Sequence, residues 1–240
     1  MHSQRSIISF MKGLRHIFFD LDRTLWDFDR NSRETLRELH DKHLVGLKGG
    51  HERFIKVYER VNEQYWGMYR SGRMEREVLR YKRFEETLFR LGMRQPEDSL
   101  VRMLGDEYLE ICPRKEGCLP KTHEVLSVLQ QRYVLHIITN GFSETQAIKL
   151  QHSGLHKYFV EVITSDATGT KKPDPMIFEH ALEISGAKKE ESLMIGDDWR
   201  ADIEGAMGVG IRAIHLTPDF HARSAEVKVI TELEHLLDHL

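Results

Sequence analysis

Short apolar runs that alternate with helix-forming stretches limit the fold of this chain more than any other feature of its sequence. Four such runs follow residue 119, and they read YVLHIIT (133–139), FVEVIT (159–164), SLMIG (192–196) and IRAIHL (211–216). The stretches between them are long enough for crossover helices, which is the pattern of a parallel β-sheet. A similar run, IFF, lies far upstream and ends directly before Asp20. We therefore expect a sheet whose first strand is separated from its neighbours by an insert.

The insert has helical periodicity from Asn31 to about Cys112. In one segment, apolar side chains recur on a single helical face, at Phe54, Val57, Tyr58, Val61, Tyr65 and Met68. Asn31 with Glu34 is typical of a helix N-terminus, whereas Gly72 and Gly92 are placed to end helices. These signals predict a bundle of about four helices.

Together the two patterns predict an α/β protein with a Rossmann-like parallel-sheet core and an inserted α-helical cap. The core is expected to be discontinuous, with residues 1–27 and 118–240 on either side of a cap formed by residues 28–117. A chain of 240 residues is long enough to bury the hydrophobic interior of such a core.

Composition and charge narrow the class of partner. The formal net charge is -3 and the pI is near 6.5, which argues against a protein dedicated to a nucleic-acid polymer or a membrane. The apolar stretch within residues 1–14 is too short and interrupted for a signal peptide, and no later run could span a bilayer. Both cysteines, Cys112 and Cys118, are expected to be reduced. We expect a cytoplasmic monomer or weak homodimer that binds a small molecule.

Polar clusters follow the predicted strands at the points where the strands end. DLDRT comes after IFF, TNG after LHII, GTKKPDP beyond VEVITSD, and GDDWRAD after LMI. In open parallel sheets, ligands bind beyond the carboxyl ends of the strands, near the point where strand order reverses. A single acid after a strand is often only a helix N-cap, but four clusters at one edge of a sheet indicate a functional site.

The residue types in these clusters indicate the ligand. Carboxylates gathered at one edge repel one another unless a cation lies between them, and oxygen ligands alone favour a hard ion such as Mg²⁺. Lys172 adds a positive charge, while the Thr139 hydroxyl and backbone N–H groups after the strands could bind anionic oxygens. A metal, a lysine and N–H donors together describe a phosphate site.

With these clusters, the sequence resembles the haloacid dehalogenase superfamily of aspartate-nucleophile phosphatases. The resemblance is to the members that have an α-helical cap after the first motif. The likeness covers the whole chain. Asp20, Asp22 and Thr24 match the first motif of the family, and Thr139 and Asn140 match the second. Lys172, before Pro173, matches the third motif, and Asp197, Asp198 and Asp202 match the fourth. The segments TLWDFDRN, ITNGFSETQAIKLQHSGLHKYF and KKPDPMIFEHALE are similar, more narrowly, to the pyrimidine 5′-nucleotidase branch. Arg23 departs from the pattern, because many members have glycine there.

The resemblance implies a role for each acid of the first motif. Asp20 would attack phosphorus to form an aspartyl-phosphate, and Asp22 would protonate the leaving oxygen and later accept a proton from water. Asp20, the backbone carbonyl of Asp22 and Asp197 would bind Mg²⁺, the implied cofactor.

The resemblance also implies which residues bind phosphate and which support the site. Phosphate would be bound by Thr139, Asn140 and Lys172, and the supporting residues would be Thr24, Asp198 and Asp202. Trp26 and Phe28 lie where the first strand leaves for the cap, so they could contact a substrate base or simply pack at the junction.

The function implied is hydrolysis of a phosphomonoester, most simply a nucleoside 5′-monophosphate. A sugar-phosphate or phosphoglycolate phosphatase is an alternative, since the phosphate end of the site would be the same. A signalling receiver domain also gathers acids, Mg²⁺, a threonine and a lysine at a sheet edge, but the large insert and Asp22 argue against it. Dehalogenation is disfavoured because the hydrolytic dehalogenases need neither Mg²⁺ nor a second acid such as Asp22.

Overall fold

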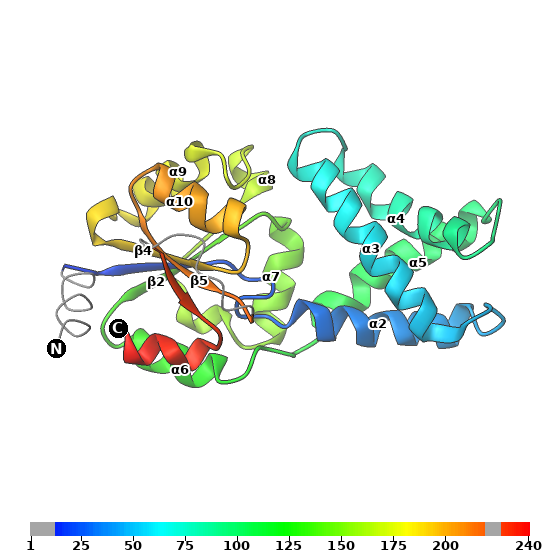
Figure 1. Ribbon diagram of the computed structural model, residues 1–240, viewed down its shortest axis with the longest axis horizontal. Helices are drawn as coiled ribbons and strands as arrows, with labels where there is room; N and C mark the ends of the chain where they lie inside the picture. The colour runs from blue at the N-terminus through cyan, green and yellow to red at the C-terminus, as the bar shows by residue number, and fades with distance from the viewer. Residues whose placement is uncertain (1–12, 219–226) are drawn as a thin grey trace. The chain divides into compact units, whose positions relative to one another are not determined.

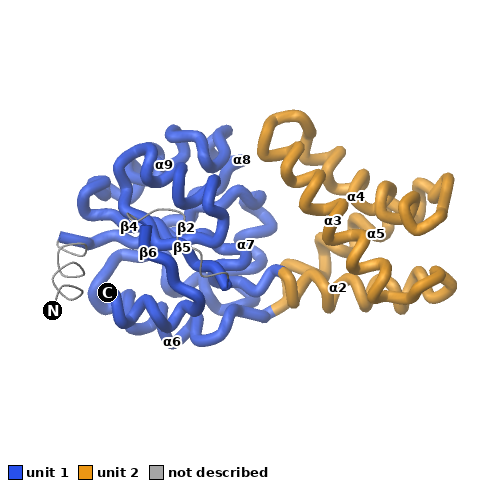
Figure 2. The backbone as a smooth tube through the Cα atoms, in the orientation of Figure 1, with its two compact units in different colours: residues 1–28, 116–240 blue, residues 29–115 orange. Residues whose placement is uncertain are grey.

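The computed structural model describes residues 13–218 and 227–240. The chain divides into two compact units, one formed by residues 1–28 and 116–240 and the other by residues 29–115 (Figure 2). The first strand and the later strands therefore belong to one unit, although a helical insert separates them in sequence.

The ends of the insert lie next to the expected cap boundaries, since residues 28–117 begin one residue before the second unit and end two residues after it. The expectation about a signal peptide falls mainly on residues 1–12, which lie outside the described residues. No helix in the described part of the chain is long and apolar enough to cross a membrane.

The larger unit is built on a parallel sheet, in which the described residues form six strands in the order β3-β2-β1-β4-β5-β6 (Figure 1). The strands are β1 (His16–Phe19), β2 (Val134–Thr139), β3 (Glu161–Thr164), β4 (Ser192–Gly196), β5 (Arg212–Leu216) and β6 (Lys228–Ile230). The first five confirm the strands expected from the apolar runs. β6 is not predicted from the sequence, because a strand of three residues is too short to show a period.

Strand order reverses at β1, which pairs with β2 on one side and with β4 on the other. Phe19 lies opposite Ile137 of β2 and opposite Ile195 of β4, both in parallel register. Ile17, Phe18 and Phe19 are fully buried, as expected for a central strand that is covered on both faces. The crevice where a parallel sheet binds its ligand is thus at the carboxyl ends of β1 and β4.

Helices cover both faces of this sheet, with α9 and α10 on one face and α6 on the other (Figure 1). They are α6 (Thr122–Leu129), α7 (Ser143–His152), α8 (Ser165–Thr168), α9 (Pro175–Ser185) and α10 (Gly205–Gly208), with helical turns η2 (His156–Tyr158), η3 (Lys189–Glu191), η4 (Trp199–Glu204) and η5 (Leu233–Asp238). The start of α9 follows from its sequence, since Asp174 accepts from the Met176 N–H over 3.0 Å and Pro175 takes the first helical position.

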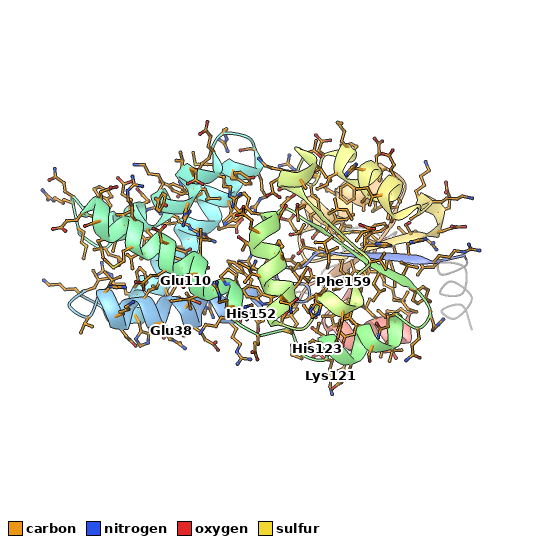
Figure 3. All side chains as sticks on the ribbon, turned by 180° about the vertical axis from the view of Figure 1, so that it is seen from behind. Glu38, Glu110, Lys121, His123, His152 and Phe159 are labelled. Carbon is orange, nitrogen blue, oxygen red and sulfur yellow. The ribbon has the colours of Figure 1, made fainter. Side chains whose placement is uncertain are left out.

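Aromatic contacts fix the segment between α7 and β3. The hydroxyl of Tyr158 lies 3.2 Å from Nδ1 of His123 on α6. Phe159 lies edge-on to Phe19 of β1, with ring centroids 6.2 Å apart; His123 and Phe159 are labelled in Figure 3. This segment therefore contacts both α6 and the central strand β1.

The smaller unit is helical, as the periodicity predicts. It contains most of α2 (Phe28–His43), together with α3 (Gly50–Arg70), α4 (Arg76–Arg90), α5 (Asp98–Ile111) and the turn η1 (Cys112–Arg114). Gly72 and Gly92 have φ of 71° and 104° just after α3 and α4, which confirms them as helix ends. Asn31 is not an N-cap, because α2 begins at Phe28 and Glu34 pairs instead with Arg30, at 2.9 Å.

Aromatic rings fill the interior of the helical unit. Tyr58 lies 5.0 Å from Phe84 and 5.6 Å from Tyr108, measured between ring centroids.

The two cysteines, Cys112 and Cys118, form no disulfide, as expected.

Candidate active site

Asp20 and Asp197 meet at the carboxyl edge of the sheet, where strand order reverses. Asp20 directly follows β1, and its backbone N–H donates to the carbonyl of Ile195 on β4 over 2.9 Å. Asp197 directly follows β4, and Asp202 comes a little later, in the π-helical turn η4. Carboxylate oxygens of Asp20, Asp197 and Asp202 lie within 4.8 Å of one another, and we call these three residues the acidic cluster.

The buried ammonium group of Lys172 partly neutralises the acidic cluster. Its Nζ donates to Oδ1 of Asp20 and to the carbonyl of Ile138, each over 2.6 Å, and forms an ion pair with Oδ1 of Asp202, also at 2.6 Å. Two of its N–H groups thus donate hydrogen bonds, and the Asp202 carboxylate is held by charge attraction. Burial alone would lower the pKa of Lys172, but Asp20 and Asp202 raise it above its ordinary value, which keeps the group charged.

One lysine does not neutralise three carboxylates. Burial raises the pKa of Asp20 to about 7, with Asp202 and Asp22 adding to the effect and Lys172 opposing it. Burial, together with Asp20 and Asp202, raises the pKa of Asp197 to about 8. A set of oxygen donors with excess negative charge is what a hard divalent cation such as Mg²⁺ prefers, so the residues present fit that cation.

A tight turn brings Asp22 to the same edge. The N–H groups of Leu25 and Trp26 donate to the carbonyl of Leu21 over 3.0 and 2.9 Å, and the N–H of Arg23 donates to the carbonyl of Trp26 over 2.9 Å. Arg23 has φ of 64°, in the left-handed region where glycine is favoured. The arginine therefore keeps the backbone conformation that a glycine would adopt, and the turn is intact.

Two side chains of α7 hold the carboxylate of Asp22. Nζ of Lys149 donates to its Oδ1 over 2.6 Å, and Nε2 of Gln146 donates to its Oδ2 over 3.0 Å. Nε2 of Gln146 also donates to Oγ1 of Thr139 over 2.7 Å, and the N–H of Gly141 donates to the same oxygen over 3.1 Å. Because both acceptor positions of the Thr139 hydroxyl are filled, its hydrogen is left to donate, which suits a phosphoryl oxygen.

The remaining matched residues support their neighbours. The amide of Asn140 donates to the carbonyl of Lys172 over 3.0 Å and accepts from its N–H over 2.8 Å. Both ends of the Asn140 side-chain amide thus hold the Lys172 backbone, and phosphate binding by Asn140 stays a prediction. Thr24 donates to Oδ1 of Asp197 over 3.5 Å, and Asp198 accepts from two backbone N–H groups at the start of η4.

His215 is a supporting residue that lies outside the four matched motifs. Its buried ring donates from Nε2 to the carbonyl of Asp197 over 2.8 Å, which fixes the backbone after β4. The only signal in the sequence is a polar residue inside an apolar strand. Gly196 has a related role, since a Cβ there would lie 2.2 Å from Oδ2 of Asp202 and would push that carboxylate out of place.

The burial of Trp26 bears on its expected role. This side chain has an exposed fraction of 0%, which favours packing at the junction over a contact with a substrate base. Phe28 is partly exposed, with the guanidinium of Arg23 4.6 Å from its ring centroid. A contact between Phe28 and substrate stays a prediction.

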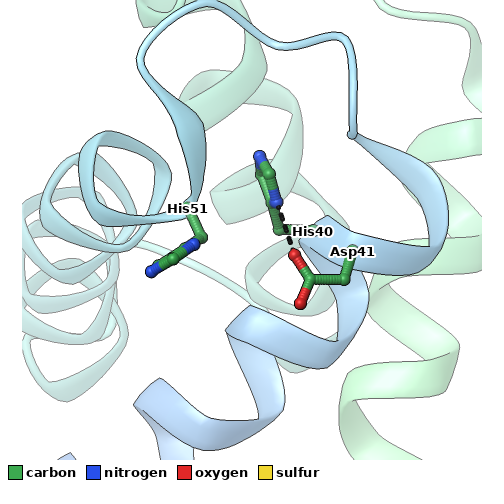
Figure 4. Close-up of side chains that lie close together, drawn as sticks. All are labelled: His40, Asp41 and His51. Atoms are coloured by element: carbon green, nitrogen blue, oxygen red, sulfur yellow. Dashed lines mark hydrogen bonds and ion pairs between the residues drawn. The ribbon is translucent and has the colours of Figure 1, made fainter.

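A second group of metal-ligand side chains lies in the helical unit. His40, Asp41 and His51 bring one ligand atom each within 4.8 Å of the others. Nδ1 of His40 and Oδ1 of Asp41 are already joined at 3.1 Å (Figure 4), and Nε2 of His51 lies 3.2 Å from Oε1 of Glu52. Since each side chain has a protein partner, we interpret the group as polar pairs that stabilise the helices.

Comparisons with known proteins agree with this geometry. A family model described as haloacid dehalogenase-like hydrolase matches residues 14–210. The pyrimidine 5′-nucleotidase YjjG of Escherichia coli is 32% identical over 228 residues, which cover 92% of this chain and 96% of that protein. The ribulose-1,5-bisphosphate 5-phosphatase of Halopiger xanaduensis is 30% identical over 226 residues, which cover 93% of each.

A solved structure extends the likeness to both units. The HAD-hydrolase YfnB of Bacillus subtilis is 28% identical over 235 residues, which cover 95% of this chain and 97% of that protein. Its crystal structure, bound to magnesium, matches with a TM-score of 0.84 and covers 95% of this chain and 98% of that chain. Since the family model spans most of the chain, including the acidic cluster and Lys172, the chain belongs to the haloacid dehalogenase-like hydrolases.

Proposed function

We propose that the protein is a Mg²⁺-dependent phosphatase that hydrolyses nucleoside 5′-monophosphates through an aspartyl-phosphate on Asp20. The observation that carries the proposal is the buried contact between Lys172 and Asp20, at 2.6 Å, with Asp22 and Thr139 at the same sheet edge. A nucleophile, a proton donor, a cation and a phosphate-binding hydroxyl are what a two-step phosphoryl transfer requires.

In the first step, a carboxylate oxygen of Asp20 attacks phosphorus and the bond from phosphorus to the leaving oxygen breaks. Asp22 gives its proton to that leaving oxygen, while the Thr139 hydroxyl donates to a phosphoryl oxygen. Negative charge moves from Asp20 to the phosphoryl group during the attack. The Lys172 ammonium, which is held 2.6 Å from Asp20, is placed to stabilise this charge.

In the second step, water attacks the phosphorus of the aspartyl-phosphate and Asp22, now ionised, accepts a proton from the water. The bond between phosphorus and the Asp20 oxygen breaks, which restores the free carboxylate and releases phosphate. Asp22 thus gives a proton to the leaving oxygen in the first step and accepts one from water in the second, so its position affects the rate of both steps.

The cation would be held by Asp20, the backbone carbonyl of Asp22 and Asp197. When bound, Mg²⁺ supplies positive charge that reduces the repulsion between a carboxylate nucleophile and an anionic phosphate. Asp202 would remain paired with Lys172 at 2.6 Å and would keep the lysine pointed at Asp20.

The choice of substrate rests on similarity rather than on a described binding residue. YjjG, a pyrimidine 5′-nucleotidase, is 32% identical over nearly the full length of both chains, which favours a small nucleotide substrate. A sugar-phosphate phosphatase is the second candidate, because the ribulose-1,5-bisphosphate 5-phosphatase relative is 30% identical over a similar span.

A panel of phosphomonoesters, assayed with Mg²⁺, tests this proposal. The panel compares pyrimidine and purine nucleoside 5′-monophosphates with ribulose bisphosphate, other sugar phosphates and phosphoglycolate. We expect the highest kcat/KM for a nucleoside 5′-monophosphate. Highest activity on a sugar phosphate would support the second candidate, and no phosphate release from any ester would reject the phosphatase assignment.

A further inference from the structure

We infer that Lys149 and Gln146 of α7 are positioning residues, which fix the carboxyl group of Asp22 where it can transfer a proton in both steps of the reaction. This inference rests on the proposed function, in which Asp22 is the acid and the base. Lys149 and Gln146 both lie outside the four family motifs that the sequence matches.

The two oxygens of Asp22 are held by two different donors. Lys149 donates to Oδ1 over 2.6 Å and Gln146 donates to Oδ2 over 3.0 Å. Two donors on separate oxygens fix the rotation of the carboxyl group about its last bond as well as its place. The Asp22 side chain is nonetheless 26% exposed, so it is reachable from outside while it is held from α7.

The burial of Lys149 indicates that this contact is more than a surface ion pair. The Lys149 side chain is only 7% exposed and Gln146 is 0% exposed. A buried ammonium is costly unless it is paired, and here Asp22 supplies the anion. Nζ of Lys149 also lies 4.5 Å from the ring centroid of Trp26. The ammonium of Lys149 thus makes a cation–π contact with the buried Trp26 ring, which helps to hold it next to Asp22.

The backbone of the neighbouring loop is shaped to admit Gln146. A Cβ at Gly141 would lie 2.3 Å from Nε2 of Gln146, so glycine leaves the space that the amide occupies. That amide also donates to Thr139 over 2.7 Å. Gln146 therefore links the hydroxyl that would bind phosphate to the acid that would serve the leaving oxygen.

The helix that carries both side chains is firmly anchored. Gln146 and Lys149 are three residues apart in α7 and so lie on the same helical face. The helix begins at Ser143, whose N–H donates to Oδ2 of Asp166 over 3.0 Å and whose hydroxyl donates to Oδ1 over 2.7 Å. A fixed helix that follows directly after the TNG segment gives the acid a rigid support.

Two consequences separate a positioning role from ordinary packing. The loss should fall on kcat rather than on KM, because Lys149 does not touch substrate. It should also be largest for esters with a poor leaving group, such as an alkyl or nucleoside phosphate, since p-nitrophenolate leaves without a proton.

The test is a double-mutant cycle of Lys149→Met with Asp22→Asn, using full-length protein and Mg²⁺. The substrates are a nucleoside 5′-monophosphate, or whichever alkyl ester the wild type hydrolyses best, and p-nitrophenyl phosphate. The rate of the first step is followed in single turnovers. Lys157→Met is the matched control, because Lys157 also lies over an aromatic ring, 5.0 Å from the Tyr158 centroid, but is exposed.

We expect Lys149→Met to lower kcat for the alkyl ester by about 10- to 100-fold, with little change in KM, since a misplacement near 1 Å can cost about 10²-fold. The first step with p-nitrophenyl phosphate should change much less. In the Asp22→Asn background the Lys149 substitution should have no further effect, Lys149→Arg should recover part of the loss, and Lys157→Met should match the wild type.

Gln146→Met is the second variant, and it keeps the inference testable if Lys149→Met does not fold in a circular dichroism melt. It should show the same extra loss for the ester with the poor leaving group, in addition to a loss shared by both esters that comes from its contact with Thr139. Losses of Lys149→Met that add to those of Asp22→Asn, or losses of either variant with no extra component for the poor leaving group, would overturn the inference in an active enzyme. A wild type that hydrolyses no ester would instead reject the proposed function, and the inference with it.

Discussion

Nζ of Lys172 lies 2.6 Å from Oδ1 of Asp20, although 152 residues separate the two in the chain. The contact forms because Asp20 directly follows the central strand β1, while Lys172 lies between β3 and α9 and so comes two strands later in the sequence. Asn140 fixes the Lys172 backbone and Asp202 fixes its ammonium, so the cation is held from both ends. The placement of this cation against the nucleophile is the basis of the proposed chemistry.

Lys172→Met should remove activity and also stability. The variant loses a donor to the reacting groups, which we expect to lower kcat by at least about 10²- to 10³-fold. It also leaves Asp20 and Asp202 buried without their cation, and breaking a buried pair in this way typically costs about 3–5 kcal/mol. Urea unfolding and steady-state assays check both effects, with the exposed Lys188→Met as control. If the unfolding free energies of the wild type and of Lys172→Met agreed within about 1 kcal/mol, the expected contribution of Lys172 to stability would be contradicted.

Asp20→Asn and Asp22→Asn should have different consequences. Without its nucleophile, Asp20→Asn should form no phosphoenzyme and show no turnover. Asp22→Asn should lower kcat by about 10²- to 10⁴-fold, the usual contribution of a general acid or base, and should prolong the phosphoenzyme. Acid-quenched samples with radiolabelled substrate measure both quantities. Near-normal turnover by Asp20→Asn would argue against covalent catalysis.

Removal of divalent cations should stop hydrolysis, and added Mg²⁺ should restore it. Ca²⁺ should inhibit, because its longer and looser coordination would misplace phosphate against Asp20. Mg²⁺ should also raise the melting temperature of the wild type, since a ligand that binds only the folded state stabilises it. Asp197→Asn should lose most of that shift. Full activity in chelated, metal-free protein would contradict the assignment of the acidic cluster.

The stability of the core should fall in acid because of His136. This residue is buried on β2, stacked on Phe18 with ring centroids 4.8 Å apart, and burial together with His16 lowers its pKa from 6.5 to about 4. Between pH 6.5 and 4 the unfolded chain binds a proton there that the folded chain does not, so stability is lost as pH falls.

His136→Phe tests this effect, because it keeps an aromatic ring and removes the titration. Between pH 7 and 4.5 the wild type should lose about 2–3 kcal/mol more unfolding free energy than the variant. Urea unfolding at the two pH values measures the difference. Equal losses in the two proteins would show that His136 does not contribute to the acid sensitivity.

Much of the fold follows from local patterns in the sequence. Most residues of β1, β2, β4 and β5 are buried, so the apolar runs of these strands are visible without any knowledge of the fold. The helix ends at Gly72 and Gly92 are equally local, because they depend on a backbone conformation that glycine adopts easily. The acids Asp20 and Asp197 could be anticipated because they directly follow strands, and parallel topology brings strand ends to one edge.

The parts that the sequence did not reveal depend on contacts between distant segments. Lys149 looks like an ordinary helix lysine until the structure places it 2.6 Å from Asp22. Asn140 stands in a motif position, but its partners are backbone atoms of Lys172, which no side-chain pattern encodes. Trp26 could either stack on a substrate or pack inside, and only its burial, which the sequence does not show, favours packing.

The central claim is that Asp20 becomes phosphorylated during turnover, and direct chemical trapping tests it. Wild-type protein or Asp22→Asn would be mixed with Mg²⁺ and the best substrate, quenched in acid within the lifetime of the intermediate, and reduced with borohydride. Reduction of an aspartyl-phosphate gives homoserine, which peptide mass spectrometry locates by residue. If Asp20 is the nucleophile, homoserine forms at position 20, and only with substrate present. Homoserine at another aspartate, or none at position 20 in an enzyme that is turning over, would contradict it.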